Sequence, residues 1–264
     1  MLQVKPAELP DFMTFMALFG VFLGGRLGYF LLYQRETLIQ DPLSFFVVWN
    51  GGMASHGAIF GIAVFLWFYA KRKGYSWTNL GDHVVVVAPI GVALGRLANF
   101  INGELIGVKT TVAWAVKFPG ELHRDTSLDM PSTFMSDLPH NSYEIYQRAE
   151  AMNLLPELEA VLNPRHPSQL YQAMLEGVLL FVILLTIRLV FKRLPNGLLT
   201  GIFFLGYAGL RIIGEIFREP DVGADLILGF SKGQFYSLFM VAAGIGFLLF
   251  ALRSRSRAPK PTEG

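Results

Sequence analysis

The chain has 264 residues, of which 53% are hydrophobic and 16% are charged, and its formal net charge is +2 at pH 7. A soluble domain usually carries about 25% charged residues, so this composition favours a membrane protein. The small net charge gives no reason to expect a nucleic-acid partner. Because the chain has no cysteine, disulfides, a cysteine nucleophile and zinc–sulfur sites are excluded.

Several segments are long enough to cross a bilayer, which takes roughly 20 predominantly apolar residues. The alternating segments of about ten residues that build a transmembrane β-barrel are absent. We therefore predict an all-α polytopic membrane protein with about six transmembrane helices and a small polar lobe at about 103–166. The predicted spans are 12–33, 56–72, 83–102, 168–191, 198–217 and 234–252.

The orientation of the helices follows from lysine and arginine in short loops, which favour the cytoplasmic side. Basic residues at 71–74, 191–195 and 253–260 all fall on one side of the predicted membrane. We expect that side to be cytoplasmic and to hold both termini. Residues 1–252 are expected to form a single integral membrane domain, followed by a basic cytoplasmic tail at 253–264.

The first two predicted spans combine small and ionisable residues. Gly24 and Gly28 lie four apart, a spacing that lets helices approach closely. Arg26 is expected to face the membrane or an interface. His56 begins the second span; it is either structural or a general base, since a neutral imidazole could take a proton from a thiol or hydroxyl. The histidines show no ligand spacing, so no metal site is expected.

The third span ends in polar residues. Arg96 and Asn99 lie three apart, which places them on one helix face. Arg96 either bridges helices through carboxylates or holds an anionic group, because its fork matches phosphate oxygens. Glu104 and Gly107 follow at the helix end, where the carboxylate of Glu104 could orient Arg96.

The later spans carry further charges. Pro167 and Ser168 suit a helix start. Arg211, Glu215 and Arg218 share one helical stripe, and an internal arginine–glutamate pair is the structural interpretation. Ionisable residues inside spans are costly and usually face the protein interior or a cavity. The predicted spans hold more arginines than acids, which favours an anionic ligand such as a lipid phosphate.

The stretch "GRLANFINGELIG" (95–107) resembles the signature of the prolipoprotein diacylglyceryl transferase family. The similarity continues in the same order over about residues 15–250. Further matching stretches are "GVFLGGRLGYFLLY", "DPL" with "WNGGMASHG", "HPSQLYQAMLEG", "GLRIIGEIFREPD" and "GQFYSL".

This resemblance implies an enzyme of the bacterial inner membrane with its active site towards the periplasm. The family transfers the diacylglyceryl group of phosphatidylglycerol to the thiol of the lipobox cysteine of a prolipoprotein, and glycerol-1-phosphate leaves. This is the first step of lipoprotein maturation. The implied partners are phosphatidylglycerol, prolipoproteins and membrane lipid, and no cofactor is implied.

The resemblance also implies roles for individual residues. His56 matches a catalytic histidine that acts as base or substrate orienter. Arg96 and Arg211 match two catalytic arginines that, with Asn99, bind phosphatidylglycerol. Residues that match positions shaping or supporting the site are Gly57, Asn102, Glu104, Gly107 and Glu215.

Family members usually begin with a further transmembrane helix that carries a functional tyrosine, and this chain starts in the loop after it. We therefore expect weakened activity from the chain as it stands, to be recovered if upstream sequence is restored. Two other functions would use the same arginines. One is a non-catalytic scaffold that binds anionic lipid, and the other is an anion transporter, for which internal repeats would be expected.

Overall fold

The computed structural model describes residues 3–47, 51–125, 127–139, 141–191, 193–220 and 232–256. Within these residues the regular structure is helical, with isolated backbone bridges that join Gly107 to Arg218 and Arg165 to both Lys109 and Val116. Contacts divide the chain into two compact units, Met1–Val84 and Val85–Gly264.

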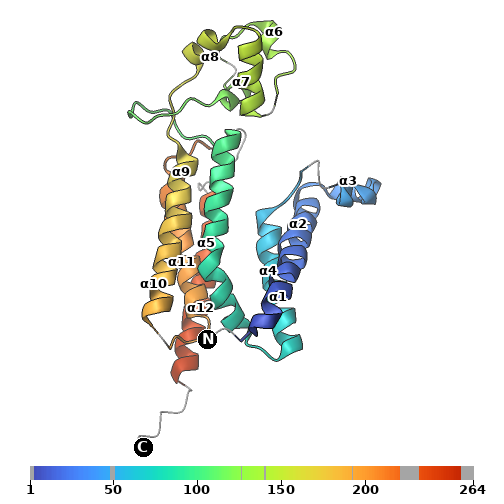
Figure 1. Ribbon diagram of the computed structural model, residues 1–264, viewed down its shortest axis with the longest axis vertical. Coiled ribbons are helices and arrows are strands. Elements are labelled where there is room, and N and C mark those ends of the chain that lie inside the picture. The colour runs from blue at the N-terminus through green and yellow to red at the C-terminus, as the bar shows by residue number, and fades with distance from the viewer. Residues whose placement is uncertain are drawn as a thin grey trace, which may run out of the picture. The chain divides into compact units, whose positions relative to one another are not determined.

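The first unit is built from short and long helical segments that follow one another closely (Figure 1). They are η1 (Pro6–Glu8), α1 (Leu9–Phe15), the π-helical η2 (Met16–Leu23), α2 (Gly24–Tyr33), α3 (Arg35–Gln40), η3 (Pro42–Phe46) and α4 (Ser55–Lys73). Helix α5 (Trp77–Asn102) begins in this unit and continues into the second.

The second unit contains long helices and a lobe of short ones (Figure 1). The lobe has η5 (Pro119–His123), α6 (Ser132–Met135), α7 (Ser142–Ala151) and α8 (Leu155–Val161). The helical segments that follow the lobe are α9 (Ser168–Gln172), the π-helical η6 (Ala173–Leu179), α10 (Leu180–Val190), α11 (Leu198–Glu215) and α12 (Lys232–Ser256). Segments α9, η6 and α10 run on as one rod, and α9 begins at Ser168 as predicted.

Five helices among the described residues are long and apolar enough to cross a membrane, which confirms a polytopic all-α protein. They are Pro6–Leu31, Trp77–Asn102, Ser168–Val190, Leu198–Glu215 and Ser237–Ser254. The remaining predicted span, 56–72, is helical as α4 but is not among these five. Helix α12 extends into the predicted tail as far as Ser256, and residues 257–264 lie outside the described part of the chain.

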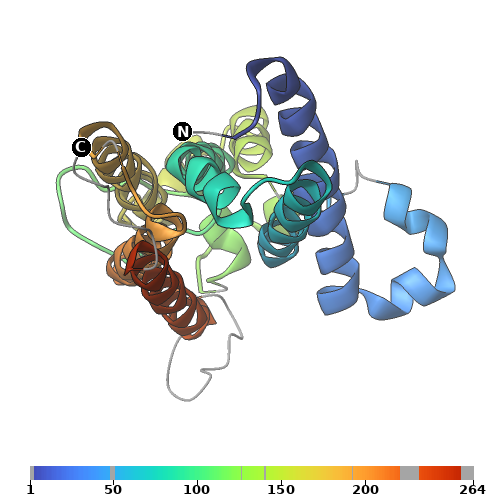
Figure 2. The same cartoon turned by 90° about the horizontal axis from the view of Figure 1, so that it is seen from below.

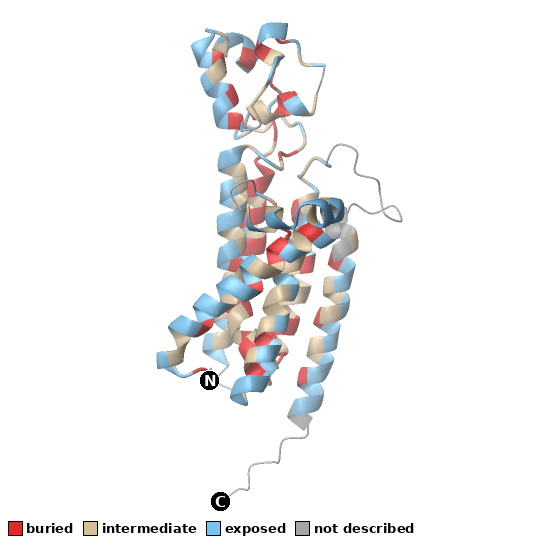
Figure 3. Cartoon of the chain, turned by 90° about the vertical axis from the view of Figure 1, so that its right-hand side faces the viewer, coloured by how far each residue is buried: buried red, intermediate tan, exposed pale blue. Residues whose placement is uncertain are grey.

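Exposed and buried residues alternate between the faces of the long helices (Figure 3), and many of the exposed ones are large and apolar. Leu94 on α5 is 61% exposed, Leu189 on α10 is 71% exposed, and Phe239 on α12 is 62% exposed. Such apolar surface on a soluble protein would mark an interaction site. Here it runs along membrane-length helices, so lipid is its solvent.

In the first unit, glycines let η2 and α2 pack directly on α4, and the two helical rods lie side by side (Figure 2). A Cβ on Gly57 would stand 2.4 Å from the carbonyl oxygen of Gly24, and one on Gly61 would stand 2.2 Å from that of Gly20. This confirms the close approach predicted from Gly24 and Gly28. It also gives Gly57 a packing reason that is independent of any active site.

Arg26 organises the segment that precedes α4. It is 3% exposed, so the prediction that it faces the membrane or an interface is wrong. Backbone carbonyls solvate its charge because the loop folds around the guanidinium. The acceptors are the carbonyl oxygens of Ser44, Phe45, Val47, Gly51 and Gly52.

The lobe of the second unit has an apolar core of its own. Phe134, Ile145 and Ala149 are fully buried there. Four short helical segments among the described residues of the lobe surround that core. The core residues are Leu122, Met130, Phe134, Ile145, Ala149, Leu158 and Leu162.

We expect Gly61→Ala to destabilise the first unit, because the added methyl would meet the backbone of Gly20 rather than a movable side chain. Overpacking of this kind costs about 1 to 3 kcal/mol. Gly246→Ala is the matched control, since a Cβ on Gly246 in α12 meets open space. Thermal unfolding in detergent should show a lower midpoint for Gly61→Ala than for wild type, and an unchanged midpoint for the control. Equal midpoints in the two variants would contradict the close packing at Gly61.

Candidate functional site

Five charged side chains from the helical rods of the second unit form one network. Arg96 on α5 donates to Glu176 in η6 at 2.9 Å, and Arg211 on α11 lies 3.6 Å from the other oxygen of Glu176. Glu215 lies 3.7 Å from both Arg211 and Arg218. The carboxylate of Glu176 therefore joins two arginines that are 115 residues apart in the chain (211 minus 96). We call Arg96, Gln172, Glu176, Arg211 and Glu215 the intramembrane polar cluster.

Close backbone packing brings these side chains together. A Cβ on Gly177 would stand 2.5 Å from the Cβ of Ala93, so α5 and η6 approach closely one residue from Glu176 and one turn from Arg96. Glu176 also lies in a π-helical segment, a distortion that is frequent at functional sites. Sequence order alone does not predict this pairing.

The cluster lies inside the membrane span, near the end that carries the lobe. Arg96 is six residues from the end of α5 and Glu176 is eight residues from the start of α9. At 1.5 Å per residue these are depths of about 9 and 12 Å. Both values are smaller than half the thickness of a hydrocarbon core, which is about 30 Å thick.

The cluster is buried, and together with Arg218 it carries net positive charge. The side chain of Glu176 is 0% exposed, and those of Arg96 and Arg211 are 12% and 17% exposed. With Arg218 the network has three arginines against two glutamates, which leaves a formal charge of +1. Because a buried charge is stable only when paired, the arrangement favours a bound anion.

The polar end of α5 is arranged differently from the prediction. Glu104 accepts hydrogen bonds from the side-chain amides of Asn99 at 3.0 Å and Asn102 at 3.4 Å. The prediction that Glu104 orients Arg96 is wrong among the described contacts, because Glu176 is the carboxylate that Arg96 meets. Asn99, Asn102 and Glu104 form a separate cap on the helix end.

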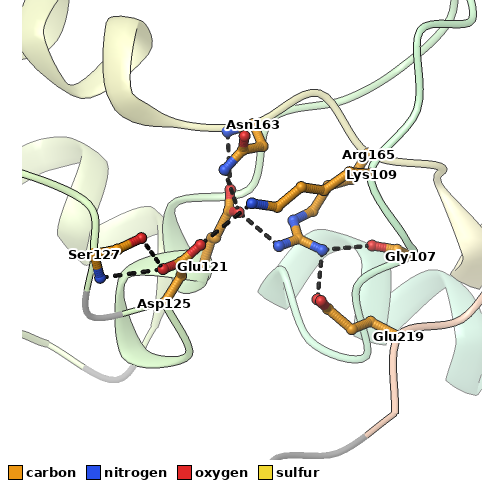
Figure 4. Close-up of polar contacts among 8 residues, drawn as sticks. All are labelled: Gly107, Lys109, Glu121, Asp125, Ser127, Asn163, Arg165 and Glu219. Atoms are coloured by element: carbon orange, nitrogen blue, oxygen red, sulfur yellow. Dashed lines mark hydrogen bonds and ion pairs between the residues drawn. The ribbon is translucent and has the colours of Figure 1, made fainter.

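Gly107 is required by a close backbone crossing at the base of the lobe. A Cβ there would stand 2.2 Å from the carbonyl oxygen of His166 and 2.8 Å from that of Phe217. The carbonyl of Gly107 accepts from the guanidinium of Arg165 at 2.9 Å (Figure 4). Gly107 therefore joins the end of α5 to the segments before α9 and after α11.

Arg165 is the centre of a second buried charge network (Figure 4). It is 1% exposed and donates to Glu121 at 2.6 Å and to Glu219. Glu121 in turn accepts from the backbone and side-chain N–H groups of Asn163 at 3.0 and 2.8 Å. These bonds tie the lobe to the chain that leaves α11, close to Arg218.

The remaining predicted site residues lie in the first unit. His56 and Gly57 belong to the first turn of α4. The side chain of His56 lies outside the described residues. The polar cluster described above lies wholly in the second unit.

Sequence reasoning missed Glu176 and Gln172, both 0% exposed. Glu176 lies within the predicted span 168–191, and an ionisable residue in a span is a site candidate by default. Its position in the sequence could therefore have indicated it. Tyr207 on α11 also interacts with Glu176 and Arg211. Arg165 and Glu121 lie in a polar region, where sequence does not distinguish buried charges from exposed ones.

Known proteins resemble this chain along most of its length. The family model described as prolipoprotein diacylglyceryl transferase matches residues 2–250. A phosphatidylglycerol–prolipoprotein diacylglyceryl transferase of Proteus mirabilis is 38% identical over 94% of this chain and 78% of its own length. The enzyme of the same name from Pectobacterium carotovorum is 42% identical over 91% of this chain and 77% of its own length.

We expect Glu121→Gln to loosen the lobe, because Arg165 would lose one of its two carboxylates while remaining buried. Breaking a buried pair from one side costs about 3 to 5 kcal/mol. Glu144→Gln, at an exposed position of α7, is the control. Hydrogen exchange at Phe134 and Ile145 should accelerate in Glu121→Gln alone; equal protection in both variants would contradict a stabilising role for the network.

The contacts of the Asp125 carboxylate at the lobe surface should depend on pH (Figure 4). Hydrogen bonds from Ser127, and then the ammonium of Lys109 at 3.3 Å, lower the pKa of Asp125 below its ordinary value. These contacts are therefore complete above the ordinary pKa of aspartate and are lost as the pH falls through the lowered one. The Ser127 amide should lose exchange protection in that acidic range, whereas Asp125→Asn should show no such step.

Proposed function

The chain belongs to the prolipoprotein diacylglyceryl transferase family, and we propose that its intramembrane polar cluster binds the phosphatidylglycerol headgroup. The observation that carries this proposal is the shared carboxylate of Glu176, which holds Arg96 and Arg211 towards one point. Each guanidinium has five N–H donors, and one carboxylate occupies few of them. The rest suit the oxygens of a phosphodiester.

The proposed reaction transfers the diacylglyceryl group to the lipobox cysteine of a prolipoprotein. The cysteine sulfur attacks the glycerol carbon of the diacylglyceryl group, and a carbon–sulfur bond forms as the carbon–oxygen bond to phosphate breaks. The electron pair leaves with glycerol-1-phosphate, and the thiol proton leaves the sulfur. His56 is assigned to receive that proton or to orient the substrate.

The arginines are suited to this chemistry because negative charge grows on the departing phosphate. Preorganised cations in a site of low dielectric stabilise such charge far more than they would in water. The nucleophile comes from the substrate, which agrees with a chain that has no cysteine. We assign Asn99 to the headgroup site and Asn102, Glu104, Gly107, Gly57 and Glu215 to its support.

The protein is a multi-pass membrane protein, and we propose the bacterial inner membrane as its location. The basic residues at 71–74, 191–195 and 253–260 support a cytoplasmic side with both termini. The lobe and the polar cluster then face the periplasmic leaflet, where lipoprotein precursors would arrive.

A lipid-binding scaffold and an anion transporter remain the alternatives that use the same arginines. Either would bind an anion without making a new covalent bond. Membership of a transferase family over residues 2–250 favours the enzyme. Release of glycerol phosphate from phosphatidylglycerol in the presence of a lipobox peptide separates the three.

We expect Arg96→Ala and Arg211→Ala each to slow glycerol phosphate release by at least about 100-fold, the usual cost of losing one transition-state donor. Arg96→Lys should lose less, because it keeps the charge but not the fork. Arg72→Ala, at an exposed position of α4, is the control. The proposal fails if both alanine variants release glycerol phosphate as fast as this control.

Glu176→Gln should separate positioning from binding. The variant gains net positive charge, so its KM for phosphatidylglycerol should not rise. Its kcat should fall about tenfold or more, because the two arginines lose the carboxylate that sets their geometry and small misplacements are costly. Glu176→Asp should recover part of kcat. A raised KM with unchanged kcat would argue against the positioning role.

A further inference from the structure

The side-chain amide of Gln172 is buried in the polar cluster without a hydrogen-bond partner. Gln172 is 0% exposed, and neither its Nε2 nor its Oε1 has a partner among the described residues. The neighbouring Gln169 differs, because its amide donates to the backbone carbonyl of Glu104. A buried polar group without a partner is costly and rare, so it calls for an explanation.

The amide of Gln172 and a carboxylate oxygen of Glu176 lie beside the same glycine. On α11, Gly214 has no side chain, and the position that its Cβ would take is 3.6 Å from Nε2 of Gln172 and 3.6 Å from Oε1 of Glu176. That oxygen also makes no hydrogen bond, although it is ion-paired with Arg211 at 3.6 Å. An amide without a hydrogen-bond partner and an ion-paired carboxylate oxygen therefore flank one glycine beside an arginine.

We propose that Gln172 is a specificity-determining residue that binds a hydroxyl group on the headgroup of the lipid substrate. A hydroxyl both donates and accepts, so it complements an amide that has a free donor and a free acceptor. A phosphodiester on Arg211 would place the alcohol esterified to it near Gly214 and Gln172. The ligand class is a polyol phosphodiester lipid, and the inference rests on the proposed function of the cluster.

Such a residue selects between lipids because a headgroup without a hydroxyl leaves its buried amide without a hydrogen-bond partner. A headgroup without a hydroxyl would fill the same place and leave the amide of Gln172 unsatisfied, which is how hydrogen-bonding sites reject analogues. The residue gives the free protein no hydrogen bond. Its removal should therefore change selectivity and not stability.

The test compares phosphatidylglycerol with phosphatidylpropanol of the same acyl chains, which keeps the phosphodiester and loses both hydroxyls. The 264-residue chain in detergent is given each lipid and a lipobox peptide, and thioether formation yields kcat/KM. We expect wild type to prefer phosphatidylglycerol by about tenfold or more, the value of one or two hydrogen bonds. Gln172→Met, similar in size and apolar, should bring that ratio close to one.

Two further measurements keep the outcomes distinct. The thermal midpoint of Gln172→Met should equal or exceed that of wild type, whereas a structural role would lower it. Arg211→Ala should slow both lipids by the same factor and leave their ratio unchanged. If the ratio of the two lipids is unaltered in Gln172→Met while Arg211→Ala is slowed, only the role of Gln172 is overturned. If Arg211→Ala keeps full activity, the headgroup site itself is overturned.

Discussion

The second unit depends on a single constraint: a carboxylate buried at membrane depth must be neutralised by cations from other helices. Glu176 meets this constraint by contacting Arg96 on α5 and Arg211 on α11. Removing either arginine or the carboxylate would leave buried charge less well paired, which is costly at this depth. The same pairing joins three helical segments, and the network that includes Glu215 and Arg218 has one positive charge in excess, which supports the proposed anion site.

Backbone contacts make this pairing geometrically possible. Gly177 packs on Ala93, and Gly214 faces Gln172 and Glu176, so the rods stand close enough for short polar contacts between them. In a membrane, association relies on such packing, because lipid is as apolar as the helix surfaces. The apolar faces that remain exposed (Figure 3) meet lipid, and the polar groups are concentrated where helices touch.

The lobe repeats the principle outside the membrane. Arg165 is buried between Glu121 of the lobe and Glu219 beyond α11, and Gly107 permits the crossing of chains that these bonds stabilise. The lobe is thereby connected to the segment that follows Glu215 and Arg218.

The amino-acid sequence by itself determined the helical class, most span boundaries, and the residue types that need an anion. These follow from local physics, since hydrophobic runs of fixed length and arginines within them carry the information in short windows. It also indicated the close approach at Gly24 and Gly28. Its resemblance to the family motifs predicted that Arg96 and Arg211 are site residues.

Only the tertiary structure decided which partners these residues have. Glu176, and not the nearby Glu104, meets Arg96, because helix packing brings together residues that are 80 apart in the chain. Arg26 is solvated by loop carbonyls, and Gln172 has no partner among the described residues. Pairing, burial and unsatisfied groups depend on how separate helices approach one another, and the order of residues along one helix does not specify that approach.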